Sequence, residues 1–311
     1  MQHPLVIVCG PTGSGKSALA VAIAQRLGGE VINCDSVQIF KYFDIGTAKS
    51  TEAERGGVPH HLLDIAEPDE LMTAGDYARL ARATLAGVSA RGRLPVIAGG
   101  TGFYLRALLD GLFEGPPRDE SLRSRLQARE IKRPGSLHRL LRRWDGAAAA
   151  RIHQNDNSKV LRALEVILTH KQTLTGLFGR GRDPLTGYRT LKIGLNPSRP
   201  ALYQRLEQRA RCMFERDGLL DEVRSLLARG YPATAKPFES LGYAQALACL
   251  KGNLTLEQAI AETQMHTRRY AKRQWTWFRG ERGIEWVDGF GGEPALQHTV
   301  MERVAGFLAA A

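Results

Sequence analysis

Short apolar runs alternate with helical segments over the first hundred residues. Residues 5–9 are continuously apolar, as in a strand that is buried on both faces. Residues 18–27 have the composition of a helix and end at a Gly-Gly pair. Residues 31–34 and 95–98 favour further strands, and residues 77–91 favour a helix between them. This alternation predicts a parallel α/β sheet flanked by helices.

The alternation stops at the Gly-Pro-Pro sequence of residues 115–117. From residue 119 to about residue 170 the pattern predicts only helices, with a polar interruption at residues 153–158. Residues 176–187 are rich in Gly and Pro and predict a loop. This middle segment therefore predicts an all-helical insertion.

The sheet pattern returns at residues 191–195, and long helices are predicted within residues 199–229 and 256–279. We expect one α/β core formed by residues 1–115 and 190–311. The all-helical insertion domain then comprises residues 116–189.

The composition is that of an ordinary folded protein, with 43% hydrophobic and 24% charged residues among 311. No apolar run approaches the roughly 18–20 residues of a membrane span. The N-terminus lacks a cationic segment, and its apolar run is too short for a signal peptide. We therefore expect a cytoplasmic protein, and a monomer. Its four isolated cysteines predict reduced thiols rather than a disulfide framework or a zinc site.

The formal net charge of +11 indicates a polyanionic partner, and most of the surplus lies in one segment. Residues 118–189 hold 13 arginines and three lysines against seven acids, a surplus of +9. A solvated charged face is the alternative explanation for this segment.

A phosphate-binding motif, G-x-x-x-x-G-K-[ST], follows the first predicted strand and opens the first predicted helix. It comprises Gly10, Pro11, Thr12, Gly13, Ser14, Gly15, Lys16 and Ser17. Its backbone amides and the helix N-terminus attract phosphate oxygens, and Lys16 adds a positive charge. The Ser17 hydroxyl is a candidate ligand for Mg²⁺. A glycine-rich turn without a ligand is the alternative. The motif predicts a P-loop NTPase-like sheet.

Two polar residues follow predicted strands beside this loop. Asp35 follows the strand at 31–34, and Thr101 follows the strand at 95–98. Because ligands bind at the carboxyl ends of parallel strands, both should border the phosphate site. Asp35 is a candidate general base or Mg²⁺ ligand, and a loop or helix-cap role is its alternative. For Thr101, the alternative interpretation is a helix-cap or turn role.

The chain resembles bacterial tRNA dimethylallyltransferases, also called tRNA isopentenyltransferases, over nearly its whole length. The matching segments are residues 10–17, 35–38, 44–49, 59–64, 98–102, 150–156, 160–166, 241–243 and 267–279. Their order and spacing are specific to this family. The chain departs from its pattern at Phe40, Ser50 and Gln154, where Tyr, Pro and Pro are usual. These departures concern local packing rather than the proposed catalytic groups.

The resemblance implies transfer of a dimethylallyl group from dimethylallyl diphosphate to N6 of the adenine immediately 3′ of the tRNA anticodon. The motif would then bind the prenyl diphosphate with Mg²⁺, and the insertion would grip the anticodon stem-loop. Lys16, Asp35 and Thr101 are the implied catalytic residues, with Asp35 as the base. Arg209 resembles a diphosphate-contacting arginine; with Arg205, four residues away, it could instead form a solvated helix face.

The resemblance also implies a set of RNA-binding residues. They are Asp35, Ser36, Val37, Gln38, Thr101, Arg123, Lys159, Val160, Leu161, Arg162, Ala163, Leu241, Gly242, Tyr243, Arg273, Gln274, Trp275, Thr276, Trp277, Phe278 and Arg279. A flipped adenine needs compensating contacts to its neighbours, which aromatic and basic side chains supply. Trp275 and Phe278 are three residues apart, so a core role is their alternative.

Three other functions compete with this one. A small-molecule kinase shares the phosphate-binding loop but gives no reason for the basic insertion. An isopentenyltransferase that acts on free adenine nucleotides does not need the insertion either. A non-catalytic RNA-binding protein leaves the loop and Asp35 unexplained.

Overall fold

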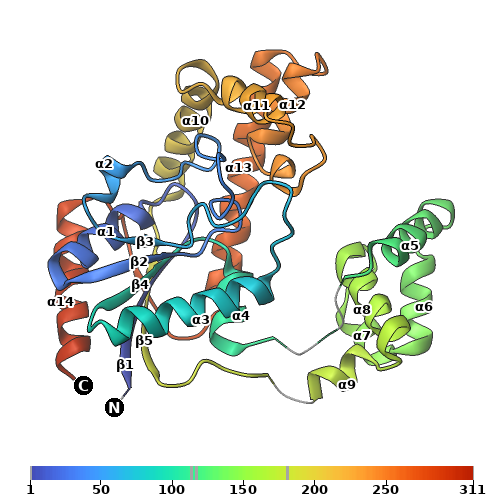
Figure 1. The fold of residues 1–311 in the computed structure, drawn as a ribbon, viewed down its shortest axis with the longest axis horizontal. Coiled ribbons are helices and arrows are strands. Elements are labelled where there is room, and N and C mark those ends of the chain that lie inside the picture. The colour runs from blue at the N-terminus through green and yellow to red at the C-terminus, as the bar shows by residue number, and fades with distance from the viewer. Residues whose placement is uncertain (1, 113–114, 116–117, 180–181, 311) are drawn as a thin grey trace. The chain divides into compact units, whose positions relative to one another are not determined.

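The computed structural model describes residues 2–112, 115, 118–179 and 182–310 of the chain (Figure 1). It divides into two compact units. The sheet unit comprises Met1–Leu109 and Leu185–Ala311, and the helical unit comprises Asp110–Pro184. The unit boundaries thus lie five or six residues before the expected ones. The last expected insertion residues, 188–189, lie in a strand of the sheet instead.

The sheet has six parallel strands in the order β3-β2-β4-β1-β5-β6. Their bounds are β1 (His3–Cys9), β2 (Gly29–Asn33), β3 (His60–His61), β4 (Leu94–Ala98), β5 (Tyr188–Leu195) and β6 (Ile284–Val287). This sheet, with its flanking helices, confirms the predicted P-loop NTPase-like fold. The edge strands β3 and β6 were not predicted.

Helices surround the sheet, and α10 to α13 gather beyond the carboxyl ends of its strands (Figure 1). The helices of this unit are α1 (Lys16–Leu27), α2 (Glu52–Arg55), α3 (Ala74–Ala90), α4 (Gly102–Asp110), α10 (Arg199–Glu215), α11 (Leu219–Ala228), η1 (Lys236–Glu239), α12 (Tyr243–Leu250), α13 (Leu256–Arg279) and α14 (Pro294–Ala309). A capping box of Thr255 and Gln258 begins α13, which spans the predicted residues.

Alternate residues of the strands form an apolar core with α1 and α14. Val6 and Val8 of β1 and Ile193 of β5 are completely buried in it, together with Ile23 of α1 and Val300 of α14. Burying side chains like these is the main contribution to the stability of the unit. The rigid sheet fixes the position of the loops that leave its carboxyl edge.

The helical unit contains α5 (Glu120–Lys132), α6 (Ser136–Trp144), α7 (Gly146–Arg151), α8 (Asn157–His170) and α9 (Leu174–Gly179). It has its own apolar core, in which Leu137 of α6 and Leu164 of α8 are fully covered. The predicted loop at 176–187 was wrong at its start, because α9 extends to Gly179; residues 180–181 lie outside the described residues. Within the described part of the chain, no helix is both long and apolar enough to cross a membrane.

Candidate active site

The glycine-rich loop turns sharply between β1 and α1. Gly10 has φ +137° and lies so close to β5 that a side chain would meet the Leu195 carbonyl oxygen at 2.8 Å. Gly15, the residue before α1, has φ +88°. Only glycine adopts both conformations without strain. The first turn of α1 holds no acidic residue. The positive potential of its free amides and of the helix dipole is therefore not reduced by a carboxylate there.

Two cations converge on this loop. The Lys16 ammonium donates to the Pro11 carbonyl oxygen at 2.8 Å, and the Arg209 guanidinium donates to the Thr12 hydroxyl at 2.9 Å. Burial lowers the pKa of Lys16 to about 8, against an opposing effect of Asp35. Burial, with a smaller effect of Arg205, lowers the pKa of Arg209 to about 10. Neither cation has an ion-pair partner among the described residues, so the site is suited to an anion.

Gln274 connects this loop to the end of β4. The Thr12 amide donates to the side-chain oxygen of Gln274 at 2.7 Å. The side-chain nitrogen of Gln274 donates to the Gly100 carbonyl at 2.9 Å. The side chain of Gln274 is buried, and its implied RNA contact stays a prediction. A helical pattern does not reveal such partners, because they lie 262 and 174 residues away.

Asp35 and Thr101 lie beside the loop, where β2 and β4 end. The Asp35 carboxylate oxygen Oδ1 accepts from the amides of Val37 and Gln38, at 2.9 and 3.3 Å. No protein donor among the described residues contacts its other oxygen. The Thr101 hydroxyl accepts from the Ser36 amide at 3.1 Å. The structure thus brings Lys16, Asp35 and Thr101 to one edge of the sheet, with one carboxylate oxygen left available.

Tyr270 of α13 closes the same site from the helix side. Burial, followed by the charge of Asp35, raises the pKa of the Tyr270 hydroxyl, which lies near the Thr101 side chain. The exposed guanidinium of Arg273 lies 5.7 Å from its ring centroid. An aromatic face therefore borders the carboxylate and the threonine.

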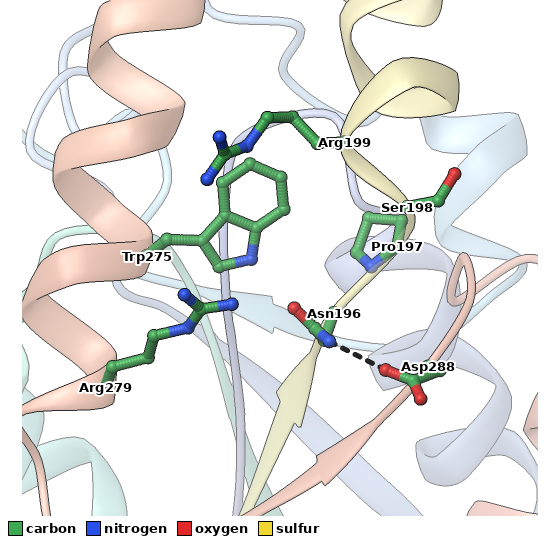
Figure 2. A pocket seen from close by; sticks show the side chains of 7 residues that line it. All are labelled: Asn196, Pro197, Ser198, Arg199, Trp275, Arg279 and Asp288. Carbon is green, nitrogen blue, oxygen red and sulfur yellow. Dashed lines mark hydrogen bonds between the residues drawn. The ribbon is translucent and has the colours of Figure 1, made fainter.

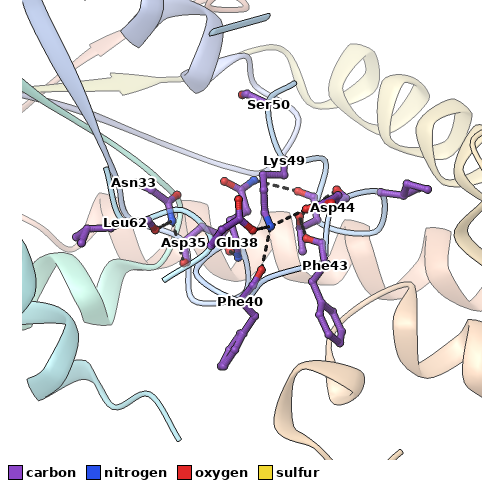
Figure 3. Close-up of polar contacts among 12 residues, drawn as sticks. Asn33, Asp35, Gln38, Phe40, Phe43, Asp44, Lys49, Ser50 and Leu62 are labelled. Carbon is purple, nitrogen blue, oxygen red and sulfur yellow. Dashed lines mark hydrogen bonds and ion pairs between the residues drawn. The ribbon is translucent and has the colours of Figure 1, made fainter. Parts of the chain in front are cut away.

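A buried lysine holds the loop that follows Asp35 (Figure 3). The Lys49 ammonium contacts the carboxylates of Asp44 and Asp64, each at 2.6 Å, and the Phe40 carbonyl at 2.9 Å. The Gln38 side chain donates to the Thr47 carbonyl at 3.1 Å. Phe40, which replaces the usual Tyr, is buried. These contacts fix the backbone that carries residues 35–38.

Tyr243 lies buried within the sheet unit, at the start of α12. Its side chain is fully buried, and its hydroxyl donates to Glu222 while it accepts from the Gly46 amide at 3.1 Å. Its ring lies 4.5 Å from that of Phe43. The implied RNA contact of Tyr243 stays a prediction; the preceding Gly242 is also buried, and Leu241 is half-buried.

The end of α13 presents cations more than aromatic rings. Trp275 and Phe278 are buried, as their core alternative predicted. Trp275 also lines a pocket of about 340 Å³, where its ring lies between Arg199 and Arg279 (Figure 2). Trp277 is half-buried beneath the Arg106 guanidinium, 4.3 Å from its centroid. The exposed residues of this segment are Arg273, Thr276 and Arg279.

In the helical unit, most of the implied RNA contacts face inward. Arg123 is 8% exposed and pairs with the fully buried Glu165 at 3.3 Å. Arg162 contacts the same carboxylate at 2.7 Å. Arg123 therefore compensates a buried acid, and its implied RNA contact stays a prediction. Lys159 is exposed and pairs with Asp156. The remaining implied contacts, Val160, Leu161 and Ala163, are buried in the core.

A family model described as IPP transferase matches residues 38–281. The chain belongs to this family. It is 61% identical over 305 residues to a tRNA dimethylallyltransferase of Solibacter usitatus (strain Ellin6076), covering 98% of this chain and 99% of that protein. It is 54% identical over 306 residues to the one of Koribacter versatilis (strain Ellin345), with the same coverage.

Solved structures of similar proteins share the fold. A full-length tRNA isopentenylpyrophosphate transferase from Bacillus halodurans is 37% identical, with a TM-score of 0.74 over 100% of this chain and 98% of that chain. A eukaryotic dimethylallyltransferase acting on tRNA is 28% identical, with a TM-score of 0.78 over 97% of this chain and 77% of that chain. The IPP transferase family is therefore supported by sequence and by structure.

Oxygen donors at the site suit a hard cation. The Ser17 hydroxyl is exposed on the first turn of α1, directly after Lys16. No group of three His, Cys, Asp or Glu side chains suited to a metal occurs among the described residues. Mg²⁺ needs no such cage, because it keeps several waters and binds substrate phosphates with one or two protein oxygens. The residues of this IPP transferase thus fit Mg²⁺ bound together with a diphosphate.

Proposed function

We propose that this chain is a tRNA dimethylallyltransferase. It transfers a dimethylallyl group from dimethylallyl diphosphate to N6 of the adenine immediately 3′ of the anticodon, and it releases diphosphate. The proposal rests mainly on one observation: an anion site, with two cations that have no ion-pair partner among the described residues, lies beside a carboxylate that has one available oxygen. Membership of the IPP transferase family supports the same reaction.

The anion site suits the leaving group. As the allylic C–O bond breaks, negative charge develops on the diphosphate, and groups already fixed around it stabilise that charge. Lys16 and Arg209 are held beside the loop amides by their bonds to the Pro11 carbonyl and the Thr12 hydroxyl. Mg²⁺ on the Ser17 hydroxyl would neutralise further charge on the diphosphate.

The carboxylate suits the acceptor. The N6 amine is conjugated with the purine ring and is a weak nucleophile, so it must lose a proton as the new bond forms. Asp35 has a fixed orientation through its two backbone bonds and an oxygen free to accept this proton. Thr101, at the end of the neighbouring strand, would orient the adenine by a hydrogen bond.

The helical unit would bind the anticodon stem-loop. An adenine stacked in the loop has to be flipped out, at a cost of a few kcal/mol, before it can enter the site. Contacts elsewhere on the RNA offset this cost, and the surplus of six positive charges in Asp110–Pro184 suits its phosphates. Because the acceptor is tRNA, we expect the enzyme to act in the cytoplasm.

A transfer assay tests this function against a kinase. Dimethylallyl diphosphate labelled in the allyl group and ATP labelled in the γ-phosphate are each offered with an anticodon stem-loop RNA and Mg²⁺. We expect label in the RNA only from the prenyl donor, and none when guanine replaces the target adenine. We also expect this donor to raise the melting temperature more than ATP does. Transfer of the γ-phosphate instead would overturn the proposal.

A further inference from the structure

Two parts of the segment that follows Asp35 lie against each other: residues 36–49, the first arm, and residues 62–66, the second arm. Their backbones bond directly, since the Ile65 amide donates to the Ile39 carbonyl at 2.9 Å. The arms also hold four of the five described residues other than glycine that have positive φ: Tyr42, Ala48, Leu62 and Asp64. Side chains disfavour this conformation, so it persists only where surrounding contacts enforce it, typically near functional sites.

Lys49 ties the two arms together. Its side chain is only 3% exposed. Its ammonium contacts the Phe40 carbonyl and the Asp44 carboxylate of the first arm, and the Asp64 carboxylate of the second arm. An ammonium has three hydrogens to donate, so these three acceptors use its whole capacity. The Lys49 side chain therefore serves the loop rather than a substrate.

Gln38 connects this tie to the Asp35 carboxylate. The Asp64 amide donates to the Gln38 carbonyl at 3.4 Å, and the Gln38 amide donates to the carboxylate of Asp35 at 3.3 Å. The side chain of Gln38 also donates to the Thr47 carbonyl at 3.1 Å. Gln38 is thus held by both arms, and the orientation of the Asp35 carboxylate depends on where its amide lies.

Asn33 makes a second connection, from the end of β2 (Figure 3). Its side chain donates to the Leu62 carbonyl at 3.0 Å and to the Asp35 carbonyl at 3.4 Å. The carbonyl of Asn33 accepts from the buried Tyr77 hydroxyl at 3.0 Å. The second arm therefore holds Asp35 through its backbone as well as through its carboxylate.

We propose that Lys49 is a positioning residue for Asp35: it keeps the two arms in the conformation that directs the available carboxylate oxygen toward the acceptor amine. The proposal rests on the proposed function, in which Asp35 takes the N6 proton. A general base acts only within hydrogen-bond reach of the proton that it removes. A misplacement of about 1 Å, caused by a change away from the reacting atoms, can lower the rate by about 10²-fold.

The test compares Lys49→Met with Lys41→Met in the full chain. Lys41 lies in the first arm and pairs with Glu67, but its side chain is 39% exposed. Single-turnover prenyl transfer is measured with saturating anticodon stem-loop RNA, and donor affinity is measured by calorimetry. Lys49→Met should lower the transfer rate by roughly 10²-fold and change the donor dissociation constant by less than about threefold. Lys41→Met should change both by less than about threefold, because an exposed ion pair contributes little.

The same substitution in the Asp35→Asn chain separates positioning from a general loosening of the site. If Lys49 acts through Asp35, Lys49→Met should slow the residual transfer of that chain by less than about threefold, because the base that it positions is already absent. An equal loss in both backgrounds would show a structural role and overturn the proposal. A parent rate in the Lys49→Met chain would overturn it too.

Asp64→Asn is the milder variant, and it keeps the proposal testable if Lys49→Met does not fold. It removes the charge that Lys49 binds in the second arm, and Asn tolerates positive φ as Asp does. The transfer rate should fall less than in Lys49→Met, again only when Asp35 is present; a loss that is independent of Asp35 would contradict the proposal. Failure of the proposed function is distinguishable, because the unmodified chain would then transfer no prenyl group to saturating RNA.

Discussion

The side-chain oxygen of Gln274 accepts a hydrogen bond from the backbone amide of Thr12 at 2.7 Å. The same side chain donates to the Gly100 carbonyl, so α13 holds the phosphate loop and the end of β4 together. Thr12 in turn receives the Arg209 guanidinium on its hydroxyl. The geometry of the anion site therefore depends on a helix that lies more than 250 residues away in the chain.

Replacing Gln274 with Ala should weaken donor binding and leave RNA affinity almost unchanged. The substitution leaves the half-buried Thr12 amide without its acceptor, which costs about 1–3 kcal/mol. We expect the dissociation constant for dimethylallyl diphosphate to rise by roughly 5- to 100-fold, as measured by calorimetry.

Gln274→Glu provides the matched control. Its carboxylate still accepts from Thr12, but it adds negative charge beside the diphosphate and cannot donate to Gly100 when ionised. Donor affinity should therefore fall further than in the Ala variant. If RNA binding fell and donor binding did not, the implied RNA contact would be correct.

Donor affinity should decrease above about pH 8, because the pKa of Lys16 is lowered to about 8 by burial. The charged form binds the diphosphate, and the neutral form loses that attraction. The donor dissociation constant should thus approach a tenfold rise per pH unit once the free protein has lost this proton. Calorimetry from about pH 7 to about pH 9.5 should also detect proton uptake on binding. Lys16→Arg, which stays charged, should give a flatter profile; an equally steep one would exclude Lys16 as the source.

Arg209 and Arg205 allow a comparison on one helix. Arg209 reaches Thr12 in the loop, whereas Arg205 is exposed over the Phe290 ring. Arg209→Gln should lower kcat/KM for the donor by roughly 10²–10³-fold, as expected for a lost donor to a developing anion. Arg205→Gln should change it by less than about threefold, because an exposed charge is screened. If both variants lost kcat/KM equally in steady-state assays, the two arginines would act only through a general electrostatic effect.

Local patterns predicted the elements that carry the site. The apolar run of β1, the glycines after it and the helical composition of α1 each agree with the structure, and so does α13. The strand β3 has only two residues, so it shows no hydrophobic periodicity, and it forms by pairing with β2. Its position could not be predicted from local sequence.

Side-chain partners were harder to predict than elements. Arg123 pairs with an acid 42 residues away, and Tyr243 bonds Glu222 inside the sheet unit. The sequence shows only that Arg123 is basic and that Tyr243 is aromatic, in a chain that resembles RNA-binding enzymes. Whether such a residue faces inward depends on which acid the fold buries beside it, and a single sequence does not show this.

Asp35→Asn should abolish most of the catalysis and leave the structure intact. The amide oxygen of Asn can still accept from Val37 and Gln38, so the turn is retained. The variant cannot take the N6 proton, and single-turnover prenyl transfer should fall by about 10²–10⁴-fold. Affinities for donor and RNA should change little, because Lys16, Arg209 and the helical unit supply their main contacts. If Asp35 is a Mg²⁺ ligand instead, donor binding and its Mg²⁺ dependence should weaken together. A titration of donor binding with Mg²⁺, run beside the single-turnover assay, separates the two roles, and a wild-type transfer rate would exclude both.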